Sequence, residues 1–102
     1  EEFQRLSIKV GKIVEAEKVE GSKKLVKLKV DLGGEVKQSL AGLAEVYNLD
    51  DLKGKLVVVL TNLKPRKLFG LESEVMLLAA VHDKDISLIV PDKDIPLGSK
   101  VT

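Results

Sequence analysis

The chain has 102 residues, which is enough for one domain with a single modest core. Hydrophobic residues make up 44% of it and charged residues 32%, a composition typical of a globular protein with a densely charged surface. The 17 Lys and Arg residues nearly balance the 16 Asp and Glu residues, so any cationic function must come from local clusters rather than from net charge.

Cysteine is absent, which excludes disulfides, thiolate metal sites and a cysteine nucleophile. Its absence is typical of proteins from a reducing compartment, and we expect a cytoplasmic location. The sequence begins with Glu1 rather than Met, which fits a trimmed chain.

Short segments with the patterning of β-strands follow one another, separated by turn signals. In residues 6–10 the even positions are apolar, and residues 26–32 have the same alternation with lysines and an aspartate between the apolar side chains. Each segment is predicted to form a strand with one buried face and one solvent face. Residues 86–90 form a further short strand.

Residues 56–60 and 75–81 are apolar at both alternations, so both faces of these two strands need cover. A closed barrel covers only the inner face. A second copy of the protein and the C-terminal tail are equally acceptable as the outer cover. Neither segment approaches the ~20 residues that a membrane helix needs, and we expect no membrane association.

Five or six short strands and one or two helical turns in residues 44–52 predict an all-β fold, the five-stranded Greek-key barrel of the OB type. The single short helix then falls between strands three and four. We predict one domain over residues 1–102, with the barrel at about 1–90 and a C-terminal extension at about 91–102.

Enzymatic chemistry finds little support in the sequence. The single histidine, His82, closes an apolar strand and has no partner at metal-ligand spacing, so we interpret it as a surface residue. Carboxylates lie beside lysines or in turns, and the glycines are too scattered for a phosphate-binding loop. We expect a non-catalytic protein without metal or cofactor.

One cluster of cations lies between residues 18 and 29, where five lysines face a single acid, Glu20. Lys27 and Lys29 share the solvent face of a strand at a step of ~6.6 Å, which is comparable to the separation of phosphates along a nucleic acid. An ordinary solvated face is the alternative interpretation. The lysines of this cluster are Lys18, Lys23, Lys24, Lys27 and Lys29.

A second cluster comprises Lys64, Arg66 and Lys67, which follow a buried strand. Pro65 restricts its own backbone and that of Lys64, so these cations are expected to be held splayed, and Gly70 lets the chain turn back. In an OB barrel this loop joins strands four and five and borders the ligand face of strands two and three. The two clusters are therefore predicted to converge.

Aromatic residues are scarce, with only Phe3, Tyr47 and Phe69 in the chain. Proteins that bind single-stranded nucleic acids stack bases on aromatic side chains, so stacking is not expected to be the main means of binding here. Recognition of a folded RNA by its backbone and 2′-hydroxyls needs cations and polar groups instead.

The sequence NLKPRKLFGLESEVMLLAA, residues 62–80, resembles the signature of the tRNA-binding domain. Residues 10–14, 24–31 and 91–99 are also similar to that family, so the resemblance covers nearly the whole chain. The domain occurs as a free-standing dimeric tRNA-binding protein, as the C-terminal appendage or separate beta subunit of methionyl-tRNA synthetase, and in synthetase-associated cofactors.

The resemblance implies an OB barrel, a homodimer built through the C-terminal extension, and binding to the outer corner of tRNA without sequence reading. Asn62 and Ser73 would offer hydrogen bonds, the lysines would neutralise phosphates, and Met76 would make an apolar contact, although Met76 also fits a plain core position. Together with the cations above, the candidate tRNA-binding residues are Lys24, Lys27, Lys29, Asn62, Lys64, Arg66, Lys67, Ser73 and Met76.

Two further hypotheses about function remain beside tRNA binding. Related dimeric barrels of this family resemble export chaperones that hold unfolded peptides, and in that case the apolar strands would do the binding. A role in docking a synthetase into a larger assembly is the third hypothesis. The family usually has glycine where Val75 stands, and a glycine there would admit a closer backbone approach.

Overall fold

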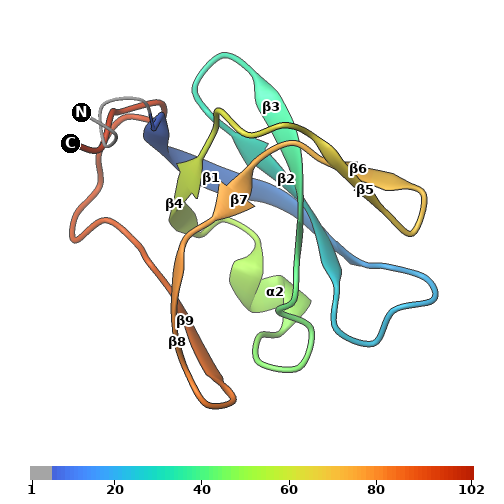
Figure 1. Cartoon of the computed structure of the whole chain (residues 1–102). Coiled ribbons are helices and arrows are strands. Elements are labelled where there is room, and N and C mark those ends of the chain that lie inside the picture. Colours follow the sequence, from blue (N-terminus) through green and yellow to red (C-terminus); the bar gives the residue numbers. More distant parts are fainter. Residues whose placement is uncertain (1–5) are drawn as a thin grey trace.

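The computed structural model describes residues 6–102, and Phe3 lies outside the described part. Runs of β-branched and other apolar residues form strands, and Gly, Asn and Asp residues lie in the turns between them. One short helix, α2 (Leu49–Leu52), interrupts this pattern (Figure 1). The strands are β1 (Ile8–Lys18), β2 (Val26–Asp31), β3 (Val36–Ala41), β4 (Leu56–Leu60), β5 (Arg66–Leu68), β6 (Leu71–Ser73), β7 (Met76–Leu77), β8 (Ala79–His82) and β9 (Asp85–Leu88).

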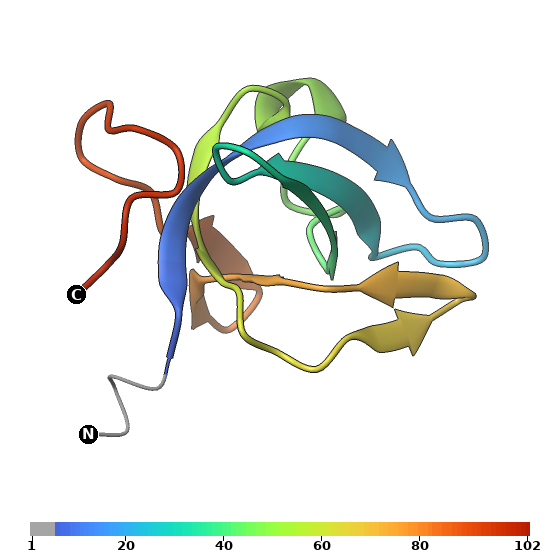
Figure 2. The same cartoon turned by 90° about the horizontal axis from the view of Figure 1, so that it is seen from above.

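Five of these strands form one antiparallel sheet in the order β3-β2-β1-β4-β7. The long strand β1 joins the β2–β3 pair to the β4–β7 pair, because its first part pairs with β4 and its second part with β2. The register shifts between Ile13 and Glu15, and such a bulge bends and twists a strand. Figure 2 shows β1 curving around the barrel as a result.

The barrel is nearly closed where β3 meets the segment that leads into β7. The Glu74 N–H donates to the Gln38 carbonyl at 2.8 Å. Side chains accept the other hydrogen bonds that a regular backbone ladder would accept. The Gln38 N–H donates to the Glu74 carboxylate, and the Leu40 N–H donates to the Ser73 hydroxyl. The fold is therefore all-β and consistent with an OB-like barrel, and the helix lies between β3 and β4 as predicted.

The core follows the predicted alternation. Val26, Leu28 and Val30 of β2 are fully buried, whereas the lysines between them face outward. Val57 and Val59 of β4 join the same core, and Leu52 of α2 packs against it. Each of these side chains contributes roughly 1.5–3 kcal/mol by leaving water.

Both faces of β4 are covered within the single chain. Val58, which points away from the core, is buried, as are Ile8 and Val10 on β1. The tail runs along β1, where the Gly98 N–H donates to the Val10 carbonyl and the Val101 N–H donates to the Ile8 carbonyl, each at 2.8 Å. Strand β4 therefore needs no second copy of the protein to cover its outer face.

The second apolar segment, residues 75–81, is not one strand. Leu78 separates β7 from β8, and β8 leaves the barrel to form a hairpin with β9 (Figure 1). Every residue of β8 is exposed, and Val81 retains 66% of its accessible surface. Within residues 6–102, no helix has the length and apolar character needed to span a membrane.

Candidate nucleic-acid interface

A β-hairpin carries the second cationic cluster. Strands β5 and β6 pair Arg66 with Ser73, Lys67 with Glu72, and Leu68 with Leu71. The two-residue loop between them has positive φ at both positions, 53° at Phe69 and 78° at Gly70. Because the hairpin stands between β4 and β7, it projects from one side of the barrel (Figure 1). Arg66 and Lys67 are exposed on it.

A hollow of about 290 Å³ lies at the base of this hairpin. Its lining includes Lys64 from the connection before β5, Arg66 of β5, Ser73 of β6 and Met76 of β7, so four candidate residues meet there. The rest of the lining is apolar, and Met76 is 47% exposed. The other lining residues are Leu40, Leu63, Leu68 and Val75.

Lys27 is next to this hollow in the sheet, because its cross-strand partner is Leu40. Its ammonium group lies 3.2 Å from the Glu17 carboxylate on β1 and is partly buried. The register of β1 also sets Glu15 opposite Lys29. Lys27 and Lys29 of β2 therefore lie beside two glutamates of β1, Glu17 and Glu15. These glutamates precede residue 18, so the charges of residues 18–29 alone did not reveal them.

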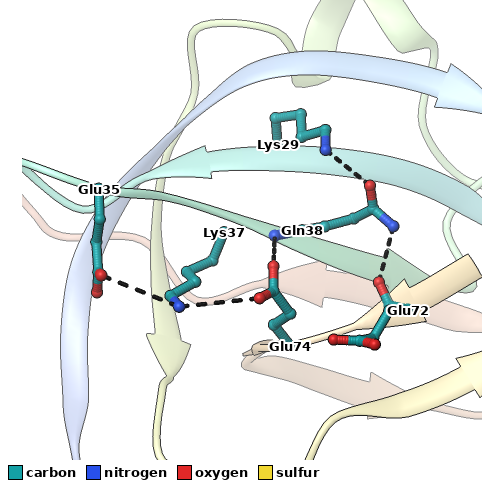
Figure 3. A network of polar contacts seen from close by, with 6 residues as sticks. All are labelled: Lys29, Glu35, Lys37, Gln38, Glu72 and Glu74. Carbon is teal, nitrogen blue, oxygen red and sulfur yellow. Dashed lines mark hydrogen bonds and ion pairs between the residues drawn. The ribbon is translucent and has the colours of Figure 1, made fainter.

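Gln38 is a further residue that the sequence did not indicate. Its side-chain oxygen accepts a hydrogen bond from the Lys29 ammonium at 2.8 Å, and its side-chain amide donates to the Glu72 carbonyl at 2.8 Å. Figure 3 shows this bridge beside the Glu74 carboxylate, which lies 3.8 Å from the Lys37 ammonium. Gln38 therefore ties the β5–β6 hairpin to the outer face of the sheet.

Asn62 and Ser73 already serve the fold. The Asn62 side-chain oxygen accepts a hydrogen bond from the Ser7 N–H at 2.9 Å. The Ser73 hydroxyl accepts from the Leu40 N–H and donates to the Val75 carbonyl at 3.4 Å. Both side chains fix the segment that connects β4 to β7, and their contact with RNA stays a prediction.

Lys24 lies in a different hollow, of about 630 Å³, together with Glu45, Asp83 and Lys84. This hollow is formed by the β1–β2 turn, the segment before α2 and the β8–β9 hairpin. A third hollow shares Leu40 and Met76 with the first hollow and Gly42 and Ile86 with the second. Lys24 is thus apart from Lys64, at the other end of a continuous row of hollows.

Val75 is buried, with 2% of its surface accessible. The side chain that stands where the family usually has glycine therefore packs into the protein. His82 is exposed beside Asp83 at the end of β8, as predicted for a surface residue. Within residues 6–102, no group of three or more His, Cys, Asp or Glu side chains could hold a metal ion.

A nearly closed antiparallel barrel with a projecting cationic hairpin defines a class of small binding modules rather than a catalytic domain. The family model described as "Putative tRNA binding domain" matches residues 8–100. The chain belongs to this tRNA-binding domain family, which is a family of non-catalytic modules, and the resemblance seen in the sequence is confirmed.

Methionine–tRNA ligases are among the similar proteins. That of Archaeoglobus fulgidus is 50% identical over 101 residues, which cover 99% of this chain and 15% of the ligase. That of Thermotoga maritima is 46% identical over 102 residues, which cover 100% of this chain and 16% of the ligase. The chain thus spans about one sixth of the length of these relatives.

Solved structures are also similar. A MetRS related protein from Pyrococcus horikoshii superposes with a TM-score of 0.93 at 37% identity, covering 99% of this chain and 94% of that one. The chaperone CsaA from Bacillus anthracis superposes with a TM-score of 0.90 at 31% identity, again covering 99% and 94%. The relatives therefore include both kinds of protein that the sequence suggested.

Proposed function

We propose that this domain binds tRNA through the β5–β6 hairpin and the hollow at its base, without reading base sequence. Its role is to hold tRNA for methionyl-tRNA synthetase, either as part of that enzyme or as a separate subunit, and so to raise the local tRNA concentration. The observation that carries this proposal is the meeting of Lys64, Arg66 and Met76 around one hollow in a chain of the tRNA-binding family.

Electrostatics supports the hairpin as the main contact. Within residues 6–102, no carboxylate oxygen lies within 4 Å of the Lys64, Arg66 or Lys67 side-chain nitrogens, whereas Lys27 and Lys37 are each paired with glutamates. Cations without a protein partner can neutralise phosphates and release their counterions. We therefore assign Lys64, Arg66 and Lys67 the primary contacts, and Lys24, Lys27 and Lys29 secondary ones.

The lining of the hollow suits a ribose or the edge of a base. Met76 and Leu63 are exposed apolar side chains beside the cations, and a backbone with 2′-hydroxyls presents both charge and apolar carbon to such a surface. Ser73 lines the same hollow and Asn62 precedes Leu63 of its lining, so both residues are included in the proposed contact surface.

A homodimer completes the proposal. Val81 on β8 and Ile89, Val90 and Ile95 beyond β9 are large exposed apolar side chains in the C-terminal part of the chain. A second copy would cover them, and two tRNA-binding faces would then act together. The absence of cysteine supports a cytoplasmic location.

Binding of unfolded peptides is the second candidate function. The similarity to CsaA chaperones and the apolar lining of the hollows favour it. In that case the cations would contribute little, and binding would weaken only slightly as salt is raised.

A titration distinguishes the two. The protein is titrated with tRNA, a duplex RNA, single-stranded DNA and an unfolded peptide at two salt concentrations. We expect tRNA to bind most tightly and its affinity to fall steeply with salt. Tight peptide binding without tRNA binding would establish the chaperone reading.

Charge reversal tests the site itself. The triple variant K64E/R66E/K67E is expected to lose tRNA affinity on the order of 100-fold while keeping its circular dichroism spectrum. The variant K12E/K53E/K93E changes three exposed lysines outside these hollows and the net charge by the same amount, so it is the matched control. Equal losses in both variants would show that only net charge matters and would refute the site.

A further inference from the structure

Phe69 occupies a backbone conformation that suits a bulky residue poorly. Its φ is 53°, in the left-handed region, and it is followed by Gly70 at 78°. Two-residue hairpin loops with positive φ at both positions favour Asn or Asp at the first position and Gly at the second. The only other non-glycine residue with positive φ in residues 6–102 is Asp83, which is of the tolerated kind.

Packing explains only part of this choice. One edge of the Phe69 ring lies against the β1–β2 turn, where a Cβ on Gly21 would stand 3.6 Å from Cδ1 and 3.8 Å from Cε1. Even so, 59% of the Phe69 surface remains exposed at the tip of the hairpin. A strained, exposed aromatic side chain points to a binding role that a short turn residue could not fill.

The segments beside the ring carry charges of both signs, since Glu72 stands opposite Lys67 on the hairpin and Glu20 precedes Gly21 on the neighbouring turn. Lys67 precedes Phe69 on the same hairpin, and Lys23 follows Gly21 on the neighbouring turn; both lysines are exposed. The two segments lie side by side in Figures 1 and 2, in agreement with the Gly21 contact. The turn is held in shape because the Ser22 hydroxyl accepts hydrogen bonds from the Lys24 and Leu25 N–H groups. The ring is therefore an exposed apolar surface with one lysine on each of the two segments that meet there, Lys67 and Lys23.

We propose that Phe69 is a stacking platform for one exposed nucleobase of the bound RNA, with the phosphates on either side held by Lys67 and Lys23. This inference rests on the proposed function and adds to it an aromatic contact that selects RNA with an unpaired or terminally exposed base. Stacking suits any base, because each has a π face, so the contact adds affinity without reading sequence. A protein side chain is the less suitable occupant, because Lys67 and Lys23 can bind the phosphates that accompany a nucleobase.

Phe69→Asn separates binding from folding. Asn is favoured at this turn position, so the melting temperature of the variant is expected to stay level or rise. Its tRNA affinity is expected to fall about tenfold, as for loss of one base–aromatic stack. Phe69→Tyr retains the ring and should bind like the parent. Val36→Asn is the matched control, because it also replaces an exposed apolar side chain by an amide without changing the charge, and as a change on β3 away from the hairpin tip it should leave tRNA affinity unchanged.

Phe69→Trp supplies a direct signal. The chain has no tryptophan, so this variant has a single indole at the proposed platform. Addition of tRNA is expected to quench its fluorescence, while a long, fully paired RNA duplex, in which almost all bases are stacked inside the helix, should quench it less at the same phosphate concentration.

Three results would overturn the inference. One is a Phe69→Asn variant that binds tRNA as tightly as the parent while K64E/R66E/K67E does not, which leaves the proposed function standing. Another is tRNA binding by Phe69→Trp without quenching. The third is quenching by an unfolded peptide and not by tRNA, which would make the ring a protein contact. If the proposed function were wrong, the parent protein itself would show no salt-dependent binding of tRNA.

Discussion

The two hairpins that leave the barrel, β5–β6 and β8–β9, are both antiparallel strand pairs joined by two residues, but their exposed side chains differ. The β5–β6 hairpin carries exposed cations and is tied to the sheet near its middle by the Gln38 amide, which donates to the Glu72 carbonyl. The β8–β9 hairpin exposes Val81 and has acids at its turn, Asp83 and Asp85. They extend in different directions from the barrel (Figure 1).

Their attachments also differ. Phe69 at the tip of the first hairpin touches the β1–β2 turn, and Ser73 at its end bonds to β3. The second hairpin is held at its base, where the Leu88 N–H donates to the Tyr47 hydroxyl at 3.1 Å. A hairpin anchored along its length can present charges in a fixed arrangement, whereas one anchored at its base leaves an apolar surface for another molecule. The difference supports our proposal that RNA and protein contacts occupy separate parts of this small domain.

The largest effect is expected from breaking the apolar hairpin. Val81→Asp places a charge on the surface that we assign to the dimer, and Ile95→Asp does so on the tail. Either change should weaken dimerisation on the order of 100-fold, because the carboxylate would be buried without a partner. Analytical ultracentrifugation measures this. Val36→Asp, at an exposed position on β3, is the control, and unchanged association of both test variants would refute the interface.

A smaller effect is expected from the base of the same hairpin. Tyr47→Phe removes the hydroxyl that accepts the Leu88 N–H and leaves that donor without its partner in a buried residue. The free energy of unfolding should fall by about 1–2 kcal/mol in urea titrations. We expect tRNA affinity to be unaffected. A parallel loss of affinity would show that the two hairpins are coupled and would end the comparison drawn above.

The smallest effect is expected from the bridge under the cationic hairpin. Gln38→Ala removes the contacts to Lys29 and to the Glu72 carbonyl, so stability should fall by about 1 kcal/mol. A drop in tRNA affinity of about threefold should accompany it, because the cations lose their fixed arrangement. Gln38→Glu keeps the acceptor for Lys29 but loses the donor, so it shows which half of the bridge matters. Hydrogen exchange of the hairpin amides reports the loosening, and unchanged exchange in Gln38→Ala would argue against the bridge.

Several parts of the fold could be predicted from local patterns. Val26, Leu28 and Val30 were identified as core residues because strand alternation depends only on neighbours in the sequence. The strand at Leu56–Leu60 was identified from a continuous apolar run, which is also a local feature of the sequence. A helix was expected in residues 44–52 because apolar residues there cluster on one side at helical spacing, and its last part, Leu49–Leu52, is helical.

Other parts depended on contacts between distant segments. Residues 75–81 read as one strand, yet the chain changes partner at Leu78, whose N–H donates to the Val58 carbonyl and whose own carbonyl accepts from the Ile89 N–H. No local pattern marks that exchange, because the partners of Leu78, Val58 and Ile89, are distant from it in the sequence. The candidate cations divide for a similar reason, since Lys64 and Lys24 line different hollows.

The sequence by itself determined the family, the all-β character and the identity of the cationic cluster, because these follow from residue types and their spacing along the chain. Only the tertiary structure decided which charges are available, by pairing Lys27 with Glu17 and Lys29 with Gln38, and where the ring of Phe69 lies. Those contacts depend on strand register and barrel closure, and a register is set by the packing of the whole molecule.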